Sequence, residues 1–203
     1  VGSLNSNLAP KVREALEQYP GLTPEVVTFG RKAHAVTSRL GLTSVADFVK
    51  AERQVTPEDL YEVVGYLSGQ YRTGKYRAVI LIYSKFKSTL SQEPTVERIL
   101  PVFEPSDLAV GDDDEVRQDE TLFEPGPQQV LDSLLPRTIE TKAYQAALEA
   151  AASEHSARMV MMKNATDAAG DLISSLQLYY NKLRQNKITT ELAEITAGKI
   201  ARE

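Results

Sequence analysis

The chain has 203 residues, of which 42% are hydrophobic and 25% are charged, a composition typical of a folded protein with one sizeable core. The absence of cysteine and the presence of two histidines exclude disulfides, thiolate metal sites and histidine-rich metal sites. A net charge of -5 argues against free nucleic acid as the main partner, because phosphate binding depends on an excess of lysine and arginine.

Residues 5–19 are predicted to form the first helix and residues 25–30 the first strand. The helix has apolar side chains at helical spacing, and Pro20 followed by Gly21 ends it. The strand segment is rich in β-branched and aromatic side chains, which are enriched in β-structure.

Residues 56–71 and 78–83 continue the alternation of helix and strand. Thr56 followed by Pro57 is typical of a helix start. The unbroken apolar run at 78–83 predicts a central strand covered by helices on both faces, and it is far shorter than the roughly 20 residues that cross a bilayer.

Residues 89–103 alternate more weakly and predict an edge hairpin with Pro94 and Pro101 at its ends. Strands and helices that alternate along the chain indicate an α/β fold built in layers. We assign residues 1–125 to this α/β domain.

Residues 69–75 match the spacing of a phosphate-binding loop but lack its other features. Tyr76 stands where a serine or threonine would hold magnesium. The segment also follows a helix and precedes a strand, so no helix N-terminus would face a phosphate. A turn from helix to strand, with Gly74 as the helix cap, is the better interpretation.

Acidic residues are concentrated in residues 93–124, which carry a net charge of -9, so that the rest of the chain carries +4. Residues 112–115 are four consecutive acids without the alternating ligands of a calcium loop. Such dense like charge predicts a solvated loop at residues 111–120.

From about residue 127 onward the pattern is that of one long helix, which Pro136 is predicted to kink or restart. Residues 137–197 alone would extend for about 90 Å at 1.5 Å per residue. The residues before them would pack into a body with a radius of gyration of about 14 Å. Most of the helix is therefore expected to extend beyond the α/β domain.

A heptad stripe, which we call the seam, runs along this helix with residues alternately three and four positions apart. This spacing is typical of a two-stranded coiled coil. The seam consists of Met162, Ala165, Ala169, Leu172, Leu176, Tyr179 and Leu183. Because no other segment carries more than two heptads, we interpret the sequence as a fragment whose missing N-terminal part supplies a partner helix and a first strand.

After Leu183 the next two heptad positions hold asparagine and threonine, so the two-helix contact is predicted to end there. A different apolar stripe follows, which we call the tip and expect to meet another partner. The tip consists of Ile188, Leu192 and Ile195.

Neither histidine has the neighbours that catalysis or metal binding requires. His34 has no second histidine within ligand range, and we predict a structural role. His155 lies between Glu154 and Ser156 on the long helix, where adjacent side chains point in different directions, which predicts a surface or interface residue. No catalytic, cofactor-binding or metal-binding residue is predicted.

Several segments, in their order along the chain, closely resemble the gamma chain of F-type rotary ATP synthases. The most specific lie on the long helix, at residues 158–167, 180–185 and 188–195. Others are residues 2–7, 29–32, 85–92 with 100–101, and 122–125. The resemblance covers essentially the whole chain but lacks the family's long N-terminal helix and first strand.

The resemblance implies a Rossmann-like three-layer α/β domain over residues 1–125 and one half of an antiparallel coiled coil over residues 126–203. It implies a non-catalytic central-stalk rotor subunit that transmits torque between the membrane c-ring and the catalytic ring and so couples proton flow to ATP synthesis. The implied partners are the alpha, beta and epsilon subunits and the c-ring. The implied location is peripheral, on the cytoplasmic face of a bacterial plasma membrane.

Six residues correspond by family position or local charge to contacts with the beta subunits or the upper bearing. These are Arg158, Lys182, Arg184, Gln185, Thr189 and Glu191. The resemblance implies no cofactor, since the ring binds the nucleotide.

Two other classes of protein remain as alternatives. An α/β signalling or scaffold module that dimerises through its heptads would explain the seam without a rotor. A small α/β enzyme would need a convergent polar pocket, which the sequence does not indicate. Neither alternative accounts for the ordered family segments.

Overall fold

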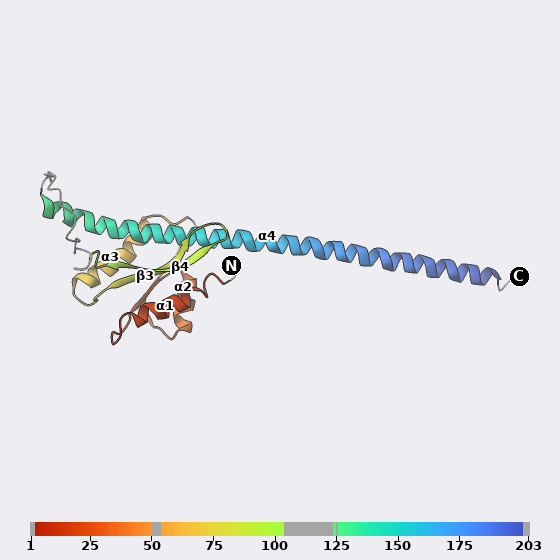
Figure 1. Cartoon of the computed structure of the whole chain (residues 1–203), viewed down its shortest axis with the longest axis horizontal. Helices are drawn as coiled ribbons and strands as arrows, with labels where there is room; N and C mark the ends of the chain where they lie inside the picture. The colour runs from red at the N-terminus through yellow and green to blue at the C-terminus, as the bar shows by residue number, and fades with distance from the viewer. Residues whose placement is uncertain (1–2, 50–53, 104–123, 125, 201–203) are drawn as a thin grey trace, which may run out of the picture. The chain divides into compact units, whose positions relative to one another are not determined.

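The computed structural model describes residues 3–49, 54–103, 124 and 126–200. They belong to two compact units, Val1–Arg158 and Met159–Glu203. The helices are α1 (Leu8–Glu17), α2 (Arg31–Arg39), α3 (Glu58–Arg72) and α4 (Pro127–Ile200), and the strands are β1 (Val26–Phe29), β2 (Ser44–Phe48), β3 (Val79–Phe86) and β4 (Gln92–Leu100) (Figure 1). The predicted loop at residues 111–120 lies outside the described residues.

The four strands form two small sheets. Strand β1 pairs in parallel with β2, and α2 connects them, whereas β3 and β4 form an antiparallel hairpin. Among the described residues no sheet has more than two strands, so the three-layer arrangement stays a prediction. The predicted helices at residues 5–19 and 56–71 and the strands at residues 25–30 and 78–83 are confirmed.

The predicted hairpin within residues 89–103 is wrong. This segment forms the single strand β4, whose hairpin partner is β3, and Pro94 lies within the strand opposite Ser84. Proline is compatible with an edge strand, since its missing N–H is not needed on the unpaired side.

The core of the first unit lies where the beginning of α4 packs with α3 and the β3–β4 hairpin. Its buried side chains are Val64, Val79, Ile99, Leu100, Ile139 and Ala143. Farther along α4, Ser153 is 0% exposed, and its hydroxyl donates a hydrogen bond of 2.9 Å to the carbonyl oxygen of Ser84. Small side chains on this helix face permit close approach to the strand.

Pro136 lies inside α4, and the helix continues through it from Pro127 to Ile200. The predicted restart of the helix at Pro136 is therefore wrong, and a kink there stays a prediction. Packing of Ile139 and Ala143 into the core supports the helix beside a residue that lacks one backbone donor.

The half-buried Glu149 carboxylate has an incomplete set of hydrogen bonds. Its Oε1 accepts a bond of 3.1 Å from Gln145, but Oε2 is buried and has no hydrogen-bond partner among the described residues. A buried polar atom without a partner costs about 1–3 kcal/mol.

We therefore expect Glu149→Met to raise the thermal midpoint of the isolated chain by roughly 2–12 °C, since each 1 kcal/mol shifts the midpoint of a chain of this size by about 2–4 °C. Calorimetry would measure the shift. Gln145→Met, on the exposed side of the contact, is the control for the lost hydrogen bond. A thermal midpoint of the Glu149→Met variant lower than that of the Gln145→Met control would contradict the expected cost of the unpaired Glu149 oxygen.

The second unit consists of the remainder of α4. Every described side chain from residue 161 to residue 198 is exposed. The large seam side chains are 48–63% exposed, and those of the tip are 48–69% exposed. The described part of this chain therefore covers neither the seam nor the tip.

Candidate functional site

The segment with phosphate-loop spacing contains the last residues of α3, which ends at Arg72, and the predicted turn after it, in which the cap residue is Thr73 and not Gly74. Gly74 follows α3 with φ of 75°, a conformation that glycine adopts without strain. The ammonium of Lys75 lies 2.7 Å from the Glu25 carboxylate and 3.1 Å from the Tyr76 hydroxyl, which itself donates to Glu25. These contacts lower the pKa of Glu25 and raise that of Lys75, so this lysine is held by an acid of its own chain.

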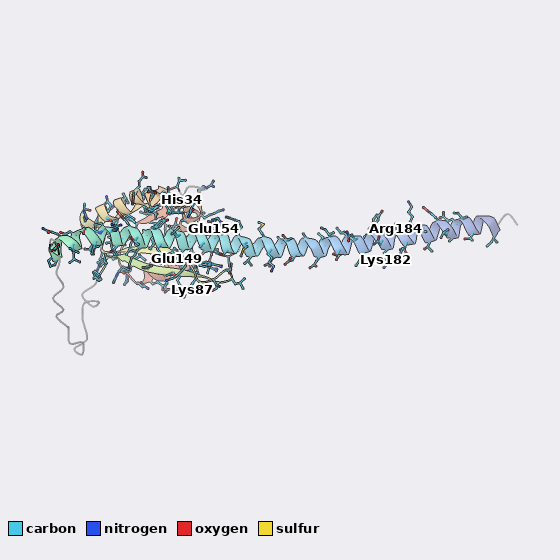
Figure 2. The ribbon with its side chains drawn as sticks, turned by 90° about the horizontal axis from the view of Figure 1, so that it is seen from above. His34, Lys87, Glu149, Glu154, Lys182 and Arg184 are labelled. Atoms are coloured by element: carbon cyan, nitrogen blue, oxygen red, sulfur yellow. The ribbon has the colours of Figure 1, made fainter. Side chains whose placement is uncertain are left out.

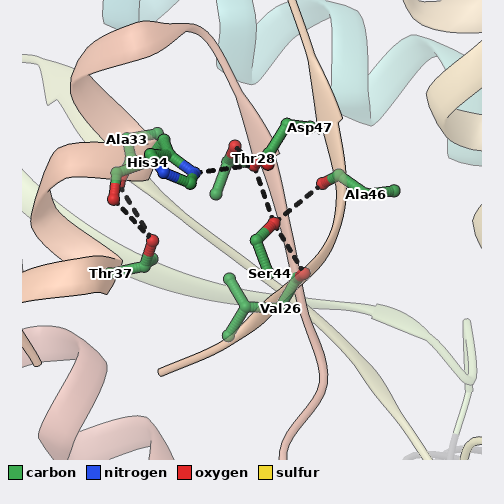
Figure 3. A network of polar contacts seen from close by, with 8 residues as sticks. All are labelled: Val26, Thr28, Ala33, His34, Thr37, Ser44, Ala46 and Asp47. Atoms are coloured by element: carbon green, nitrogen blue, oxygen red, sulfur yellow. Dashed lines mark hydrogen bonds and ion pairs between the residues drawn. The ribbon is translucent and has the colours of Figure 1, made fainter. Parts of the chain in front are cut away.

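A polar network in the first unit surrounds the Asp47 carboxylate (Figure 3). Its Oδ1 atom accepts from the hydroxyls of Thr28 at 2.5 Å and Ser44 at 2.7 Å, and it lies 3.1 Å from Nδ1 of His34. The network joins β1, α2 and β2. It agrees with the predicted structural role of His34.

This network has the residue types of a catalytic relay but not its geometry. In a relay, the imidazole lies between the nucleophile and the carboxylate. Here Ser44 and His34 both contact the same oxygen of Asp47, so the serine donates to the acid directly. The arrangement ties α2 to the β1–β2 pair and does not activate a hydroxyl.

Three donors on one carboxylate hold the pKa of Asp47 at about 2, chiefly through the hydrogen bond from Thr28. Because this value lies below that of an unfolded aspartate, about 3.9, the stabilisation is complete above about pH 4 and is lost as the pH falls through about 2. We expect Asp47→Asn to lower the urea midpoint of the isolated chain at pH 7 and to flatten its acid dependence.

Urea titrations between pH 2 and pH 7 would measure this effect. Asp171→Asn, which removes an exposed carboxylate from the second unit, is the matched control. Parallel midpoint curves for the parent chain and the Asp47 variant would show that the network contributes no pH-dependent stability.

The described residues contain no group of three or more histidines, cysteines or acids that could hold a metal ion. No described helix is long and apolar enough to span a membrane. A groove of about 440 Å³ lies between α1 and β4, but its charged side chains include Lys11, which pairs with Glu14 at 2.6 Å, and Glu93, which pairs with Lys87 at 3.1 Å. Because Lys11 and Glu93 are engaged in these ion pairs, they do not form a convergent set of reactive groups in the groove.

The predicted contact residues all lie on α4, but the structure does not gather them into one cluster. Arg158 ends the first unit, and its guanidinium lies 2.5 Å from Glu154 and 3.5 Å from Nδ1 of His155, which is exposed as predicted. The other contact residues are on the second unit, where Figure 2 shows Lys182 and Arg184. Neither of these two cations forms an ion pair within the described ranges.

The remaining contact residues lie on the next turns of the helix. The Thr189 hydroxyl donates to the carbonyl oxygen of Gln185 at 2.9 Å, and the Glu191 carboxylate lies 4.0 Å from Lys187. These local contacts leave the helix surface available to a partner, because an exposed ion pair of this kind stabilises a protein by less than about 1 kcal/mol.

Two exposed apolar residues beside the seam were missed by the sequence analysis. Ile173 and Tyr180 lie next to Leu176 and line a groove of about 490 Å³ with it. Ile173 lies four residues after Ala169, and Tyr180 lies four residues after Leu176. This spacing places both on the same side of the helix as the seam, and it could have identified them from the sequence. A strict two-position heptad pattern ignores this third apolar position.

Comparison with known proteins identifies close relatives over nearly the whole chain. The family model described as ATP synthase matches residues 1–201. The ATP synthase gamma chain of Verminephrobacter eiseniae is 44% identical, and that of Chloroflexus aurantiacus is 38% identical. Each of these alignments covers 98% of this chain and 68% of the relative.

Solved structures share the fold at lower identity. The central stalk and c-ring structure of the Tetrahymena thermophila mitochondrial ATP synthase includes a chain that matches with a TM-score of 0.59 at 22% identity, over 81% of this chain and 70% of that one. A chain of the Euglena gracilis mitochondrial ATP synthase matches with a TM-score of 0.63 at 19% identity, over 98% and 68%. The small sheets and the long C-terminal helix therefore form a known fold.

Proposed function

Because this chain belongs to the ATP synthase gamma chain family, we propose that it is the central-stalk rotor subunit of an F-type ATP synthase. In this role it transmits torque between the membrane c-ring and the ring of alpha and beta subunits, and so couples proton flow to ATP synthesis. The observation that carries the proposal is the second unit, a helix with two exposed apolar stripes. Such a surface requires partners.

We propose that the subunit itself is non-catalytic. The polar groups that resemble reactive motifs are engaged in structural contacts, as the Lys75 pair and the Asp47 network illustrate. Nucleotide chemistry then belongs to the surrounding subunits, and this chain contributes motion.

We propose that residues 1–125 form a Rossmann-like domain and that residues 126–203 provide one half of an antiparallel coiled coil. The parallel β1–β2 pair with its connecting helix supports the first part, since this unit is the building block of doubly wound sheets. The exposure of the seam supports the second part, because a seam is stable when a partner helix covers it.

We propose different partners for the different surfaces of the chain. The beta subunits and the upper bearing contact the six predicted residues, with Arg184 and Gln185 the most important, and the tip enters an apolar sleeve. The first unit meets epsilon and the c-ring. This arrangement makes the chain a peripheral subunit on the cytoplasmic face of a bacterial membrane.

Reconstitution tests this function. An affinity-tagged form of the chain, expressed with the other subunits, should co-purify with alpha, beta and epsilon in a complex that hydrolyses ATP and pumps ions. A stable two-chain species with no affinity for the alpha and beta ring would favour a scaffold module that dimerises through its heptads. Turnover by the purified chain alone would contradict a non-catalytic role.

A further inference from the structure

One face of α4 carries polar and small side chains along the β3–β4 hairpin, beyond the apolar core. Its members lie four, three and four residues apart and are Lys142, Ala146, Glu149 and Ser153. Ala146 is buried, and the buried Ser153 hydroxyl binds the carbonyl oxygen of Ser84 on β3. This face of the helix is therefore held against the hairpin.

The hairpin contributes Tyr83 and Glu97 to the same contact. They are diagonal neighbours on one side of the hairpin, since Glu97 pairs with Leu81, two residues before Tyr83. The buried Tyr83 hydroxyl donates a hydrogen bond of 3.2 Å to Oε2 of Glu97, and Oε1 of Glu97 lies 3.5 Å from the ammonium of Lys142. Each oxygen of the Glu97 carboxylate thus has a partner.

Glu149 has one oxygen without such a partner. It lies on α4 between Lys142, which contacts β4, and Ser153, which contacts β3. Its Oε2 atom is buried and has no hydrogen-bond partner among the described residues. Burial, followed by the negative charges of Glu149 and Glu97, raises the pKa of Tyr83 to about 12, so this hydroxyl keeps its proton at neutral pH. One donor therefore lies in the field of two carboxylates.

We infer that the Tyr83 hydroxyl is a two-position hydrogen-bond switch, which binds Glu97 in the present structure and Glu149 in a second state of the same fold. In the second state Lys142 alone holds Glu97, and the unpaired oxygen of Glu149 gains a donor. The exchange breaks one hydrogen bond to a carboxylate and forms another. Because the two bonds are of the same kind, the two states differ little in free energy.

The contacts of the two acids explain why Tyr83 is the group that moves. Native proteins pair nearly all of their buried polar atoms, so an unpaired carboxylate oxygen requires an explanation. Gln145 already donates to the other oxygen of Glu149, and Ser153 donates to the backbone of β3. Tyr83 can be released by its present partner, since Glu97 keeps Lys142 when the hydroxyl leaves.

The two states differ in what the hydrogen bond joins. In the present structure it joins β3 to β4 within the hairpin, whereas in the second state it joins β3 to α4. The second state adds a bond between the core contact of Ala143 and the Ser153 contact, close to where the first unit ends at Arg158. If the proposed function holds, torque passes through this contact, and the hydroxyl sets how firmly α4 is held there.

Double-mutant cycles on the full chain test the switch by urea unfolding at pH 7. Tyr83→Phe removes the donor and Glu149→Met removes the acceptor. In the parent chain their coupling should be below about threefold in the unfolding equilibrium constant, because the hydroxyl is bound to Glu97. In a Glu97→Leu background the coupling should rise to about tenfold or more, as expected for a hydrogen bond to a carboxylate.

Glu93→Leu is the matched control background. Glu93 is another acid on β4, but it pairs with Lys87 at 3.1 Å and does not hold Tyr83. The coupling should stay below about threefold there. The side chain of Glu97 is 36% exposed, so its replacement is expected to leave the fold intact.

Two results of the cycles would overturn the switch. Coupling below threefold in the Glu97→Leu background would mean that the hydroxyl does not reach Glu149. Equal coupling of tenfold in the parent, Glu93→Leu and Glu97→Leu backgrounds would mean that the hydroxyl is already shared by both acids, without a second state.

Amide exchange gives a measurement that does not depend on unfolding. Exchange in residues 145–158 should slow about fivefold in Glu97→Leu, and Tyr83→Phe added to it should remove the slowing. Lys142→Met, which leaves Glu97 dependent on the tyrosine, should not slow exchange. Slowing that persists without the tyrosine hydroxyl would overturn the switch.

These measurements use the chain alone, so they separate the switch from the proposed function. If the cycles behave as expected but the chain does not assemble with alpha and beta subunits, the switch stands and the rotor role fails. If assembly and turnover are normal but the coupling is absent, the rotor role stands and the switch is wrong.

Discussion

Replacing Arg184 and Gln185 together by alanine is expected to slow ATP hydrolysis and ATP-driven ion pumping about tenfold or more, while the chain still folds and assembles. Both residues lie on the exposed helix of the second unit. Alanine is well tolerated at such positions, and surface substitutions usually change stability by less than about 0.5 kcal/mol. Stability is therefore expected to be nearly unchanged.

The loss of turnover follows from the proposed contact with the beta subunits. A hydrogen bond to a charged group is worth about 1.5–3 kcal/mol, and each 1.36 kcal/mol in an activation barrier changes a rate about tenfold. Because Arg184 has no ion-pair partner within the described part of the chain, its charge is available to a neighbouring subunit.

The measurement uses a reconstituted complex with subunit stoichiometry checked separately. Lys163→Ala with Asn164→Ala is a matched control, since it removes one cation and one amide from an equally exposed turn of the same helix. Unchanged rates in a fully assembled Arg184 and Gln185 variant would mean that these residues are a solvated surface, even though the family is right.

Amide hydrogen exchange in the isolated chain is expected to differ by orders of magnitude along α4. Residues 139–153 pack onto the β3–β4 hairpin and should exchange slowly. The seam from Met162 to Leu183 is exposed and should exchange fast, because helix propensity alone stabilises an unsupported helix only marginally.

Assembly should reverse the contrast. In the complex, the seam becomes covered, and its amides should become as protected as those of residues 139–153, which serve as the internal reference. Mass spectrometry of peptic fragments measures both segments in one sample. Slow exchange of the seam in a monomeric chain would show that the second unit does not need a partner helix.

Local patterns were sufficient for most elements and insufficient for α2, β2 and β4. The helices at residues 5–19 and 56–71 and the strand at 78–83 follow from apolar spacing within a few turns of chain. Helix α2 and strand β2 were not predicted, because α2 has few apolar residues and the inward positions of β2 include Ser44 and Ala46. Strand β2 is stabilised by pairing with β1, which is a non-local contact.

The candidate site shows the same division. The exposed apolar stripes and the cations of α4 follow from the sequence, since helical periodicity alone sets which residues share a face. The Asp47 network does not, because its members come from three elements up to 19 residues apart. The orphan oxygen of Glu149 is likewise invisible in sequence, since burial depends on which strand the helix packs against.

The sequence by itself determined the length of the helix, its seam and tip, the turn at Gly74 and the family. All of these depend on spacing along one segment or on the order of segments. Only the tertiary structure decided that residues 89–103 contribute one strand, that α4 continues through Pro136, and that Ser153 anchors it on β3. These features depend on contacts between residues far apart in the chain, for which local periodicity carries no information.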